Sequence, residues 1–242
     1  MSFCAKIRGQ WKKESNVIFL SLWAGLLSGL CWLLGDILLV GFEVDKESYA
    51  SFTEQSRIGN KNLAMLMLSG SVGRLRLGAL VANFSIPLML VSLYALFGLT
   101  NKDLWAYLSI ALLGIGFALS PVAHVAFYYV GIISKKAYKR SGGQVCSDED
   151  SGLINEAVLF LDITWRTAIA LTGLGWLVYS LLIVTGQTIL PAYLGLLTPL
   201  PLSLLTILLV EKLRIGRPYL NGAGLNIGFS LFYLLLLLHI GS

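Results

Sequence analysis

Four ionisable side chains lie within long apolar segments of this sequence: Asp36, His124, Asp162 and Arg166. A charged group is costly in such a segment unless it is paired, so each of the four is a candidate site residue. A carboxyl group in apolar surroundings tends to keep its proton and can then act as a general acid, and a neighbouring histidine can relay that proton. The four residues therefore predict acid/base chemistry, with Asp36 as the proton donor and His124 as the relay.

Asp162 and Arg166 stand four positions apart, which is a favourable spacing for an ion pair on one helix. This pair could position a substrate, or its two charges could simply neutralise one another. Asp36 and His124 have no partner nearby in the sequence, so each must find one on another helix, in water or in a ligand.

Further polar and aromatic side chains fall close to these four residues. We interpret them as substrate-binding, because the aromatic rings could line an apolar pocket or stabilise a cation. The alternative is that the rings serve as core residues or interface anchors. The set comprises Trp32, Asn83, Tyr128, Trp165 and Asn226.

Membrane helices must hold these side chains in place. The chain has 242 residues, of which 56% are hydrophobic and 13% charged, and its mean hydropathy is +0.77. This composition excludes a water-soluble catalytic module. A basic tail over 1–16 precedes a six-helix transmembrane domain over 17–242, so the predicted class is an all-α, polytopic membrane helix bundle. Each crossing needs about 20 apolar residues, and the predicted spans are about 17–42, 76–99, 104–134, 155–186, 190–210 and 219–240.

The order of the spans predicts that the polar residues share one layer. Because successive spans run in opposite directions, the four ionisable residues fall in the same half of the membrane, roughly 10–16 Å below the first, third and fifth loops. Asn83 and Asn226 land at a similar depth. Pro121 lies inside the third span, which could therefore be one helix or a broken one.

Positive charge gathers in the first, third and fifth loops, which carry 12 of the 18 Lys and Arg residues. The positive-inside rule therefore places these loops in the cytoplasm, whereas four charges directly before the first span favour the opposite orientation. The net charge of +5 suits contact with anionic membrane lipids, and nothing in the sequence indicates nucleic-acid binding.

Two pairs of glycines have the small-xxx-small spacing that lets membrane helices approach closely: Gly25 with Gly29, and Gly224 with Gly228. Packing within one chain explains both pairs. A homodimer through either pair is the alternative.

Other chemistry has little support in the sequence. Three cysteines and two histidines form no zinc-binding pattern, and neither a nucleophile elbow nor a dinucleotide fingerprint is present. We therefore expect neither a metal nor a cofactor.

Four short motifs carry a resemblance: Gly35-Asp36-Ile37-Leu38-Leu39, Leu75-Arg76-Leu77-Gly78, Ala123-His124-Val125-Ala126-Phe127 and Asn221-Gly222-Ala223-Gly224-Leu225-Asn226. Together they resemble an uncharacterised family of six-span bacterial membrane proteins, from about residue 20 onward. The resemblance implies the six-span fold and a bacterial inner membrane location, and it draws attention to Asp36, His124 and Asn226. It implies no activity.

Three functions fit these observations. The leading hypothesis is a membrane-embedded enzyme that performs acid/base chemistry on a lipid or isoprenoid-like substrate. A small proton-coupled transporter or carrier is the alternative, and a non-catalytic membrane adaptor is the third.

Overall fold

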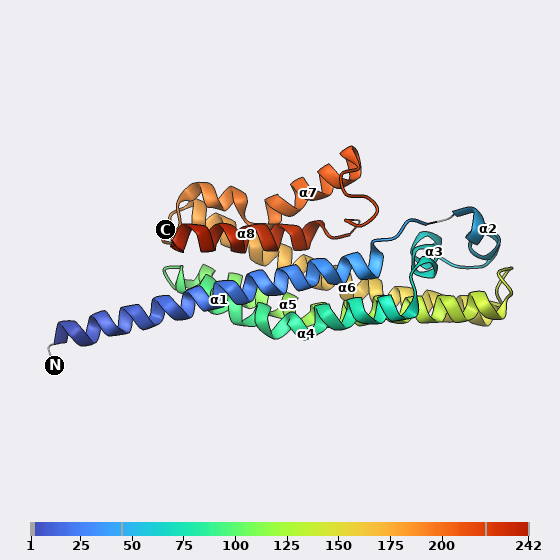
Figure 1. Cartoon of the computed structure of the whole chain (residues 1–242), viewed down its shortest axis with the longest axis horizontal. Helices are drawn as coiled ribbons and strands as arrows, with labels where there is room; N and C mark the ends of the chain where they lie inside the picture. The colour runs from blue at the N-terminus through green and yellow to red at the C-terminus, as the bar shows by residue number, and fades with distance from the viewer. Residues whose placement is uncertain (1–2, 45, 221, 242) are drawn as a thin grey trace.

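The computed structural model describes residues 3–44, 46–220 and 222–241, with side chains from Ser15 onward. Within these ranges the chain is all-helical, and most of the helices run along the long axis of the molecule (Figure 1). They are α1 (Phe3–Val40), α2 (Lys46–Gln55), α3 (Lys61–Ser69), α4 (Val72–Gly98), α5 (Leu104–Arg140), α6 (Asp148–Val184), the 3-10 helix η1 (Ala192–Leu197), α7 (Pro199–Leu213) and α8 (Gly224–Gly241).

Among the residues that the structure describes, five helical segments are long and apolar enough to cross a membrane. They are Ser15–Val40 of α1 together with α4, α5, α6 and α8. The predicted class, a polytopic membrane helix bundle, is thereby confirmed, and the protein is a multi-pass integral membrane protein.

The predicted crossing over 190–210 is divided between η1 and α7. Prolines have no backbone N–H and favour the first turn of a helix; Pro191 precedes η1, and Pro199 opens α7. With 15 residues, α7 is only about 22 Å long. A sixth crossing through α7 stays a prediction.

The third predicted span is one unbroken helix, since α5 continues through Pro121. Its start is fixed by Asp103, whose side chain accepts a hydrogen bond from the Ala106 N–H at 2.8 Å. Ser147 caps the start of α6 in the same way, through the Asp150 N–H at 3.1 Å.

The helices α5 and α6 have 37 residues each, about 55 Å, whereas a bilayer core is about 30 Å thick. Their surplus length packs against α2 and α3 around a second hydrophobic core, which includes Phe52, Met67 and Ile154. We call α2, α3 and the adjoining ends of α5 and α6 the head (Figure 1).

Hydrogen bonds tie the segment between α2 and α3 to α6. The Asn155 side chain accepts from the Gly59 N–H at 2.8 Å and donates to the Arg57 carbonyl at 2.9 Å. The Cys146 N–H, just before α6, donates to Ser56 Oγ at 2.9 Å. The first loop is therefore a packed part of the molecule.

Glycines set the close approach of helices inside the bundle. A Cβ atom at Gly35 of α1 would lie 3.0 Å from the Gly78 carbonyl oxygen of α4. Gly25 and Gly29 face Tyr233 and Ser230 of α8, and the Gly224–Gly228 pair faces α7. Packing within the chain therefore accounts for both predicted glycine pairs, and a homodimer stays a prediction.

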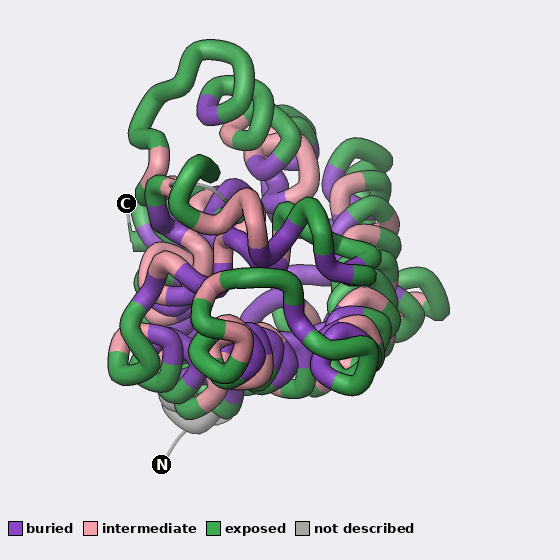
Figure 2. Tube along the Cα trace, turned by 90° about the vertical axis from the view of Figure 1, so that its right-hand side faces the viewer, coloured by how far each residue is buried: buried purple, intermediate pink, exposed green. Residues whose placement is uncertain are grey.

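The remaining interior of the bundle is apolar, with large rings such as Phe117, Trp176 and Phe232 fully buried. Buried positions turn toward the middle of the molecule in the view along its long axis, and exposed ones lie around the outside (Figure 2). Exposed leucines and aromatic residues on that outside are expected where lipid replaces water.

Candidate functional site

A cavity of about 620 Å³ lies among α1, α5, α6, α7 and α8. Five of the predicted site residues line it: Trp32, Asp36, His124, Trp165 and Asn226. Four helices thus bring to one place residues that the sequence separates by up to 194 positions, from Trp32 to Asn226.

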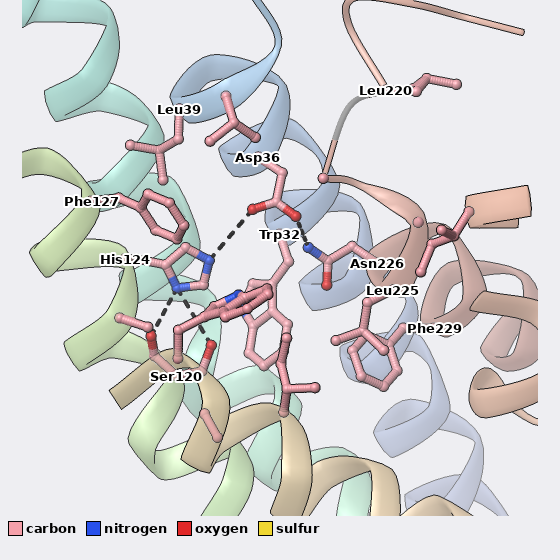
Figure 3. Close-up of a pocket in the computed structure, with 18 of the residues that line it drawn as sticks. Trp32, Asp36, Leu39, Ser120, His124, Phe127, Leu220, Leu225, Asn226 and Phe229 are labelled. Carbon is pink, nitrogen blue, oxygen red and sulfur yellow. Dashed lines mark hydrogen bonds and ion pairs between the residues drawn. The ribbon is translucent and has the colours of Figure 1, made fainter. Parts of the chain in front are cut away.

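The Asp36 carboxylate is the centre of the polar group in this cavity (Figure 3). Its Oδ2 accepts a hydrogen bond from Asn226 Nδ2 at 2.5 Å, and its Oδ1 lies 3.8 Å from His124 Nε2. The side chains of His124 and Asp36 are 10% and 18% exposed. The two groups that lacked partners in the sequence therefore face each other in a mostly buried setting.

The orientation of the His124 ring follows from its own helix. His124 Nδ1 lies 3.0 Å from the Ser120 carbonyl oxygen, one turn earlier in α5, and 3.4 Å from Ser120 Oγ. Because a carbonyl can only accept, this contact requires the hydrogen to be on Nδ1. In the neutral ring, Nε2 then carries the lone pair that faces Asp36.

The register between α1 and α8 places Asp36 opposite Asn226. The two helices run antiparallel, and one stripe of α1 meets α8 along its length. The contacts are Gly25 with Tyr233, Gly29 with Ser230, Trp32 with Phe229, whose ring centroids are 5.8 Å apart, and Asp36 with Asn226.

Aromatic rings close the cavity at its deep end. The Trp32 indole meets the Phe117 ring edge-on at 5.7 Å between centroids, and it lies 6.1 Å from the His124 ring. Phe117 and Phe229 are themselves fully buried and 5.7 Å apart. On α1 the lining extends from Trp32 to Val40 and no deeper among the described residues.

The opposite end of the cavity has a charged rim that the sequence analysis missed. Glu211 of α7 and Arg217 of the following loop line it, and Arg217 Nε donates to the Val210 carbonyl at 3.1 Å. Both charges stand at the end of a span, where they resemble ordinary topology signals. Only the turn from α7 into α8 brings them to the cavity.

Asp162 and Arg166 lie outside the cavity. They form the expected ion pair at 2.8 Å, but their side chains are 41% and 72% exposed on the outer face of α6. This placement favours the structural interpretation of the pair, in which the charges neutralise one another.

Asn83 and Tyr128 also lie outside the cavity. Asn83 is half-buried on α4, and the Tyr128 ring packs edge-on against Tyr129 at 5.2 Å. Neither residue reaches the Asp36 group. In the part of the chain that the structure describes, no group of three His, Cys, Asp or Glu residues could hold a metal ion.

The fold and the cavity define a multi-span helical membrane protein with a carboxylate–imidazole pair embedded among its helices. Its sequence matches the model of the family of unknown function DUF6796 over residues 14–242, and the chain belongs to that family. No curated protein and no solved structure matches the chain. The family match agrees with the resemblance to an uncharacterised family and assigns no activity.

Proposed function

We propose that the protein is a membrane-embedded enzyme that performs acid/base chemistry on a lipid or isoprenoid-like substrate. The observation that carries this proposal is the Asp36–His124 pair, which shares a largely apolar cavity with room for a substrate. An apolar pocket with a few convergent titratable groups is a common form of catalytic site.

The pair can hold one proton in two places. The Ser120 carbonyl fixes the hydrogen on His124 Nδ1, so a further proton resides either on His124 Nε2 or on Asp36 Oδ1. In this proposal Asp36 Oδ1 gives its proton to one position of the substrate, and His124 Nε2 accepts a proton that the substrate loses from another position. His124 then passes that proton to the Asp36 carboxylate, which restores both groups. Asn226 keeps the carboxylate oriented through its hydrogen bond to Oδ2.

The walls of the cavity suit a substrate that comes from the lipid. Trp165 and Ile169 of α6 and Ile207 of α7 line the cavity and are also 36–43% exposed on the outside of the molecule. The cavity thus reaches the outer surface between α6 and α7, where an apolar molecule would enter sideways from the bilayer.

The closed deep end is compatible with an enzyme, whereas a carrier would have to part the rings that pack there. A carrier must open its site to both sides of the membrane, whereas Trp32, Phe117 and Phe229 pack edge-on across the deep end. An enzyme needs only one opening. An adaptor, the third hypothesis, needs no such cavity.

Comparison of membrane lipids from cells that produce the wild-type protein or the Asp36→Asn variant tests the proposal. The amide keeps the shape of the side chain but cannot donate an acid proton, so we expect a lipid that wild type consumes to accumulate, and its product to disappear. The matched control is Asp162→Asn, which changes an exposed carboxylate on α6 and should behave as wild type.

The decisive readout is a difference in covalent structure between the lipids of the two cell lines. If wild type and Asp36→Asn give the same lipid species, and only their distribution between the leaflets differs, the enzyme proposal is wrong and the carrier alternative replaces it.

A further inference from the structure

The Trp32 indole carries a hydrogen-bond donor with no acceptor. Trp32 is 3% exposed, and its Nε1 atom is buried without a hydrogen-bond partner among the described residues. Buried donors are nearly always paired, because an unpaired one loses its bonds to water without compensation. Trp32 also lines the cavity. A bound molecule is therefore the natural source of the missing acceptor.

The position of Trp32 connects this donor to the Asp36–His124 pair. Trp32 lies one helical turn before Asp36 on α1, about 6 Å along the helix axis, and its ring centroid is 6.1 Å from that of His124. An acceptor atom held at the indole would therefore lie in the same part of the cavity as Asp36 and His124. In Figure 3 the Trp32 and His124 side chains occupy the same part of the cavity, beneath Asp36.

We infer that the cavity binds an amphiphile through an uncharged oxygen that accepts a hydrogen bond from Trp32 Nε1. The inference rests on the proposed function and adds the substrate class: an apolar chain that ends in a carbonyl, hydroxyl or ether oxygen. Trp32 binds the oxygen on the side of the cavity where Asp36 and His124 face each other.

The charges around the cavity argue for an uncharged oxygen. Asp36 and Glu211 line it with acidic side chains, and Arg217 is the one permanently positive side chain among the described residues that line it. Once Asp36 has given up its proton, a phosphate or carboxylate headgroup beside it would meet a like charge in apolar surroundings. A neutral oxygen satisfies the indole without that repulsion, and its chain can lie against Ile169 and Ile207.

Trp176 provides a matched control. Its Nε1 is also buried without a described partner, and the residue is fully buried, but it does not line the cavity. The substitutions Trp32→Phe and Trp176→Phe each remove one unpaired indole N–H and keep an aromatic ring. Only the first changes a residue that lines the cavity.

The experiment uses the full-length protein in lipid nanodiscs, with the tryptophan indoles labelled with nitrogen-15. A long-chain methyl ketone and the alkane of equal length are titrated in turn. We expect the ketone to move the Trp32 indole proton signal downfield, and the alkane to leave it in place. Loss of one hydrogen bond should weaken ketone binding about 2- to 10-fold in Trp32→Phe, with Trp176→Phe unchanged.

Three results would overturn the inference: a Trp32 signal that the ketone does not move, equal affinity of wild type for ketone and alkane, or equal loss in both tryptophan variants. The wild-type spectrum decides the matter even if Trp32→Phe does not fold. Ketone binding should persist in Asp36→Asn, so the failure of the proposed reaction and the failure of this binding mode give different results.

Discussion

Asn226 is the residue that most directly holds the Asp36 carboxylate in place. Its Nδ2 donates to Asp36 Oδ2 from the first turn of α8, and Asn226 is itself 4% exposed. A carboxylate that loses such a donor in a buried site keeps its desolvation penalty and loses its compensation. The pair therefore links the stability of the bundle to the geometry of the site.

Replacement of Asn226 by Leu should lower the free energy of unfolding by about 1–3 kcal/mol, because it leaves Asp36 Oδ2 unsatisfied. In a double-mutant cycle with Asp36→Leu the two changes should be non-additive, and the readout is unfolding in mixed micelles. The control is Asn83→Leu, a half-buried amide on α4, which should show no coupling to Asp36. Additivity of the Asn226 and Asp36 changes would contradict the assigned contact.

At this scale the sequence identifies most of the polar centre and misses its rim. Asp36, His124 and Asn226 could be found because polar groups inside apolar segments stand out by residue type alone. The residue types do not reveal how each helix is rotated about its axis. For this reason Asp162 is predicted to lie at the site but lies outside it. Glu211 and Arg217 escape prediction because their position depends on a turn between two helices.

The helices α5 and α6 depend on glycine at points of close contact. A Cβ atom at Gly175 of α6 would lie 2.7 Å from Leu113 Cγ and 3.0 Å from the Leu113 backbone nitrogen of α5. The Gly175 carbonyl also accepts a hydrogen bond from Ser109 Oγ at 2.9 Å. The two helices that carry His124 and Trp165 are thus held at a distance that a larger residue would change.

The substitution Gly175→Ala should destabilise the protein by about 1–3 kcal/mol through overpacking against α5. Gly173, two positions earlier on the same helix, has open space around it, and a Cβ atom added there would meet nothing within 4 Å. Gly173→Ala should therefore be neutral or should stabilise by about 0.5–1 kcal/mol, as in an ordinary helix interior. Thermal unfolding of both variants in detergent makes the comparison, and a similar loss in each would refute the packing argument.

Arg74 of α4 binds the C-terminal end of α1, the end that carries Asp36. Its Nη2 donates to the carbonyls of Ile37 and Gly41 at 2.7 and 3.0 Å, and its guanidinium lies 4.1 Å from the centre of the Phe42 ring. The last carbonyls of a helix lack partners of their own and attract a cation.

Replacement of Arg74 by Met should cost about 1.5–3 kcal/mol of stability, the usual worth of hydrogen bonds from a charged donor. Arg74→Lys should recover only part of it, because an ammonium group lacks the planar guanidinium that stacks on the Phe42 ring. Arg76→Met, at an exposed position nearby on α4, is the matched control and should change stability by less than about 0.5 kcal/mol. Chemical denaturation in micelles would measure all three.

Among the elements, the sequence predicts the long apolar helices well and the short amphipathic helices poorly. Among the described residues, five of the predicted spans coincide with helices that are long and apolar enough to cross a membrane, because about 20 consecutive apolar residues leave few alternatives. The sequence predicts a loop where the structure has α2 and α3. The stability of these two helices comes from contact with α5 and α6, which the local sequence does not reveal. The fifth predicted span is divided because Pro191 and Pro199 start new helical segments.

The molecule as a whole has one basic end and one short-looped end. The head and the turn from α7 to α8 lie at the end of the predicted first, third and fifth loops (Figure 1). At the opposite end, the segments around Asn101 and Gln187 meet, and Asn101 Nδ2 donates to Gln187 Oε1 at 3.1 Å. This arrangement gives the sixth crossing a direct test.

Single cysteines at Lys102, Gln187, Gln144 and Lys212, in a variant without the native cysteines, should divide into two pairs. We expect Lys102→Cys and Gln187→Cys to react with a membrane-impermeant maleimide from one side of sealed vesicles, and Gln144→Cys and Lys212→Cys from the other. If Lys212→Cys reacts from the same side as Gln187→Cys, then α7 does not cross the membrane and the six-span prediction is wrong.

The register between α1 and α8 determines whether Asp36 lies opposite Asn226. A slide of one residue along either helix moves a side chain by about 1.5 Å and turns it by about 100°, so the Gly25–Tyr233 and Asp36–Asn226 contacts are satisfied together or not at all. Gly25 is 11 residues before Asp36, roughly 16 Å away. Substitutions at Gly25 would therefore impair the chemistry of a site that this glycine does not touch. A survey of tolerated mutations would show a second set of intolerant positions, remote from the cavity, that resembles a part of it.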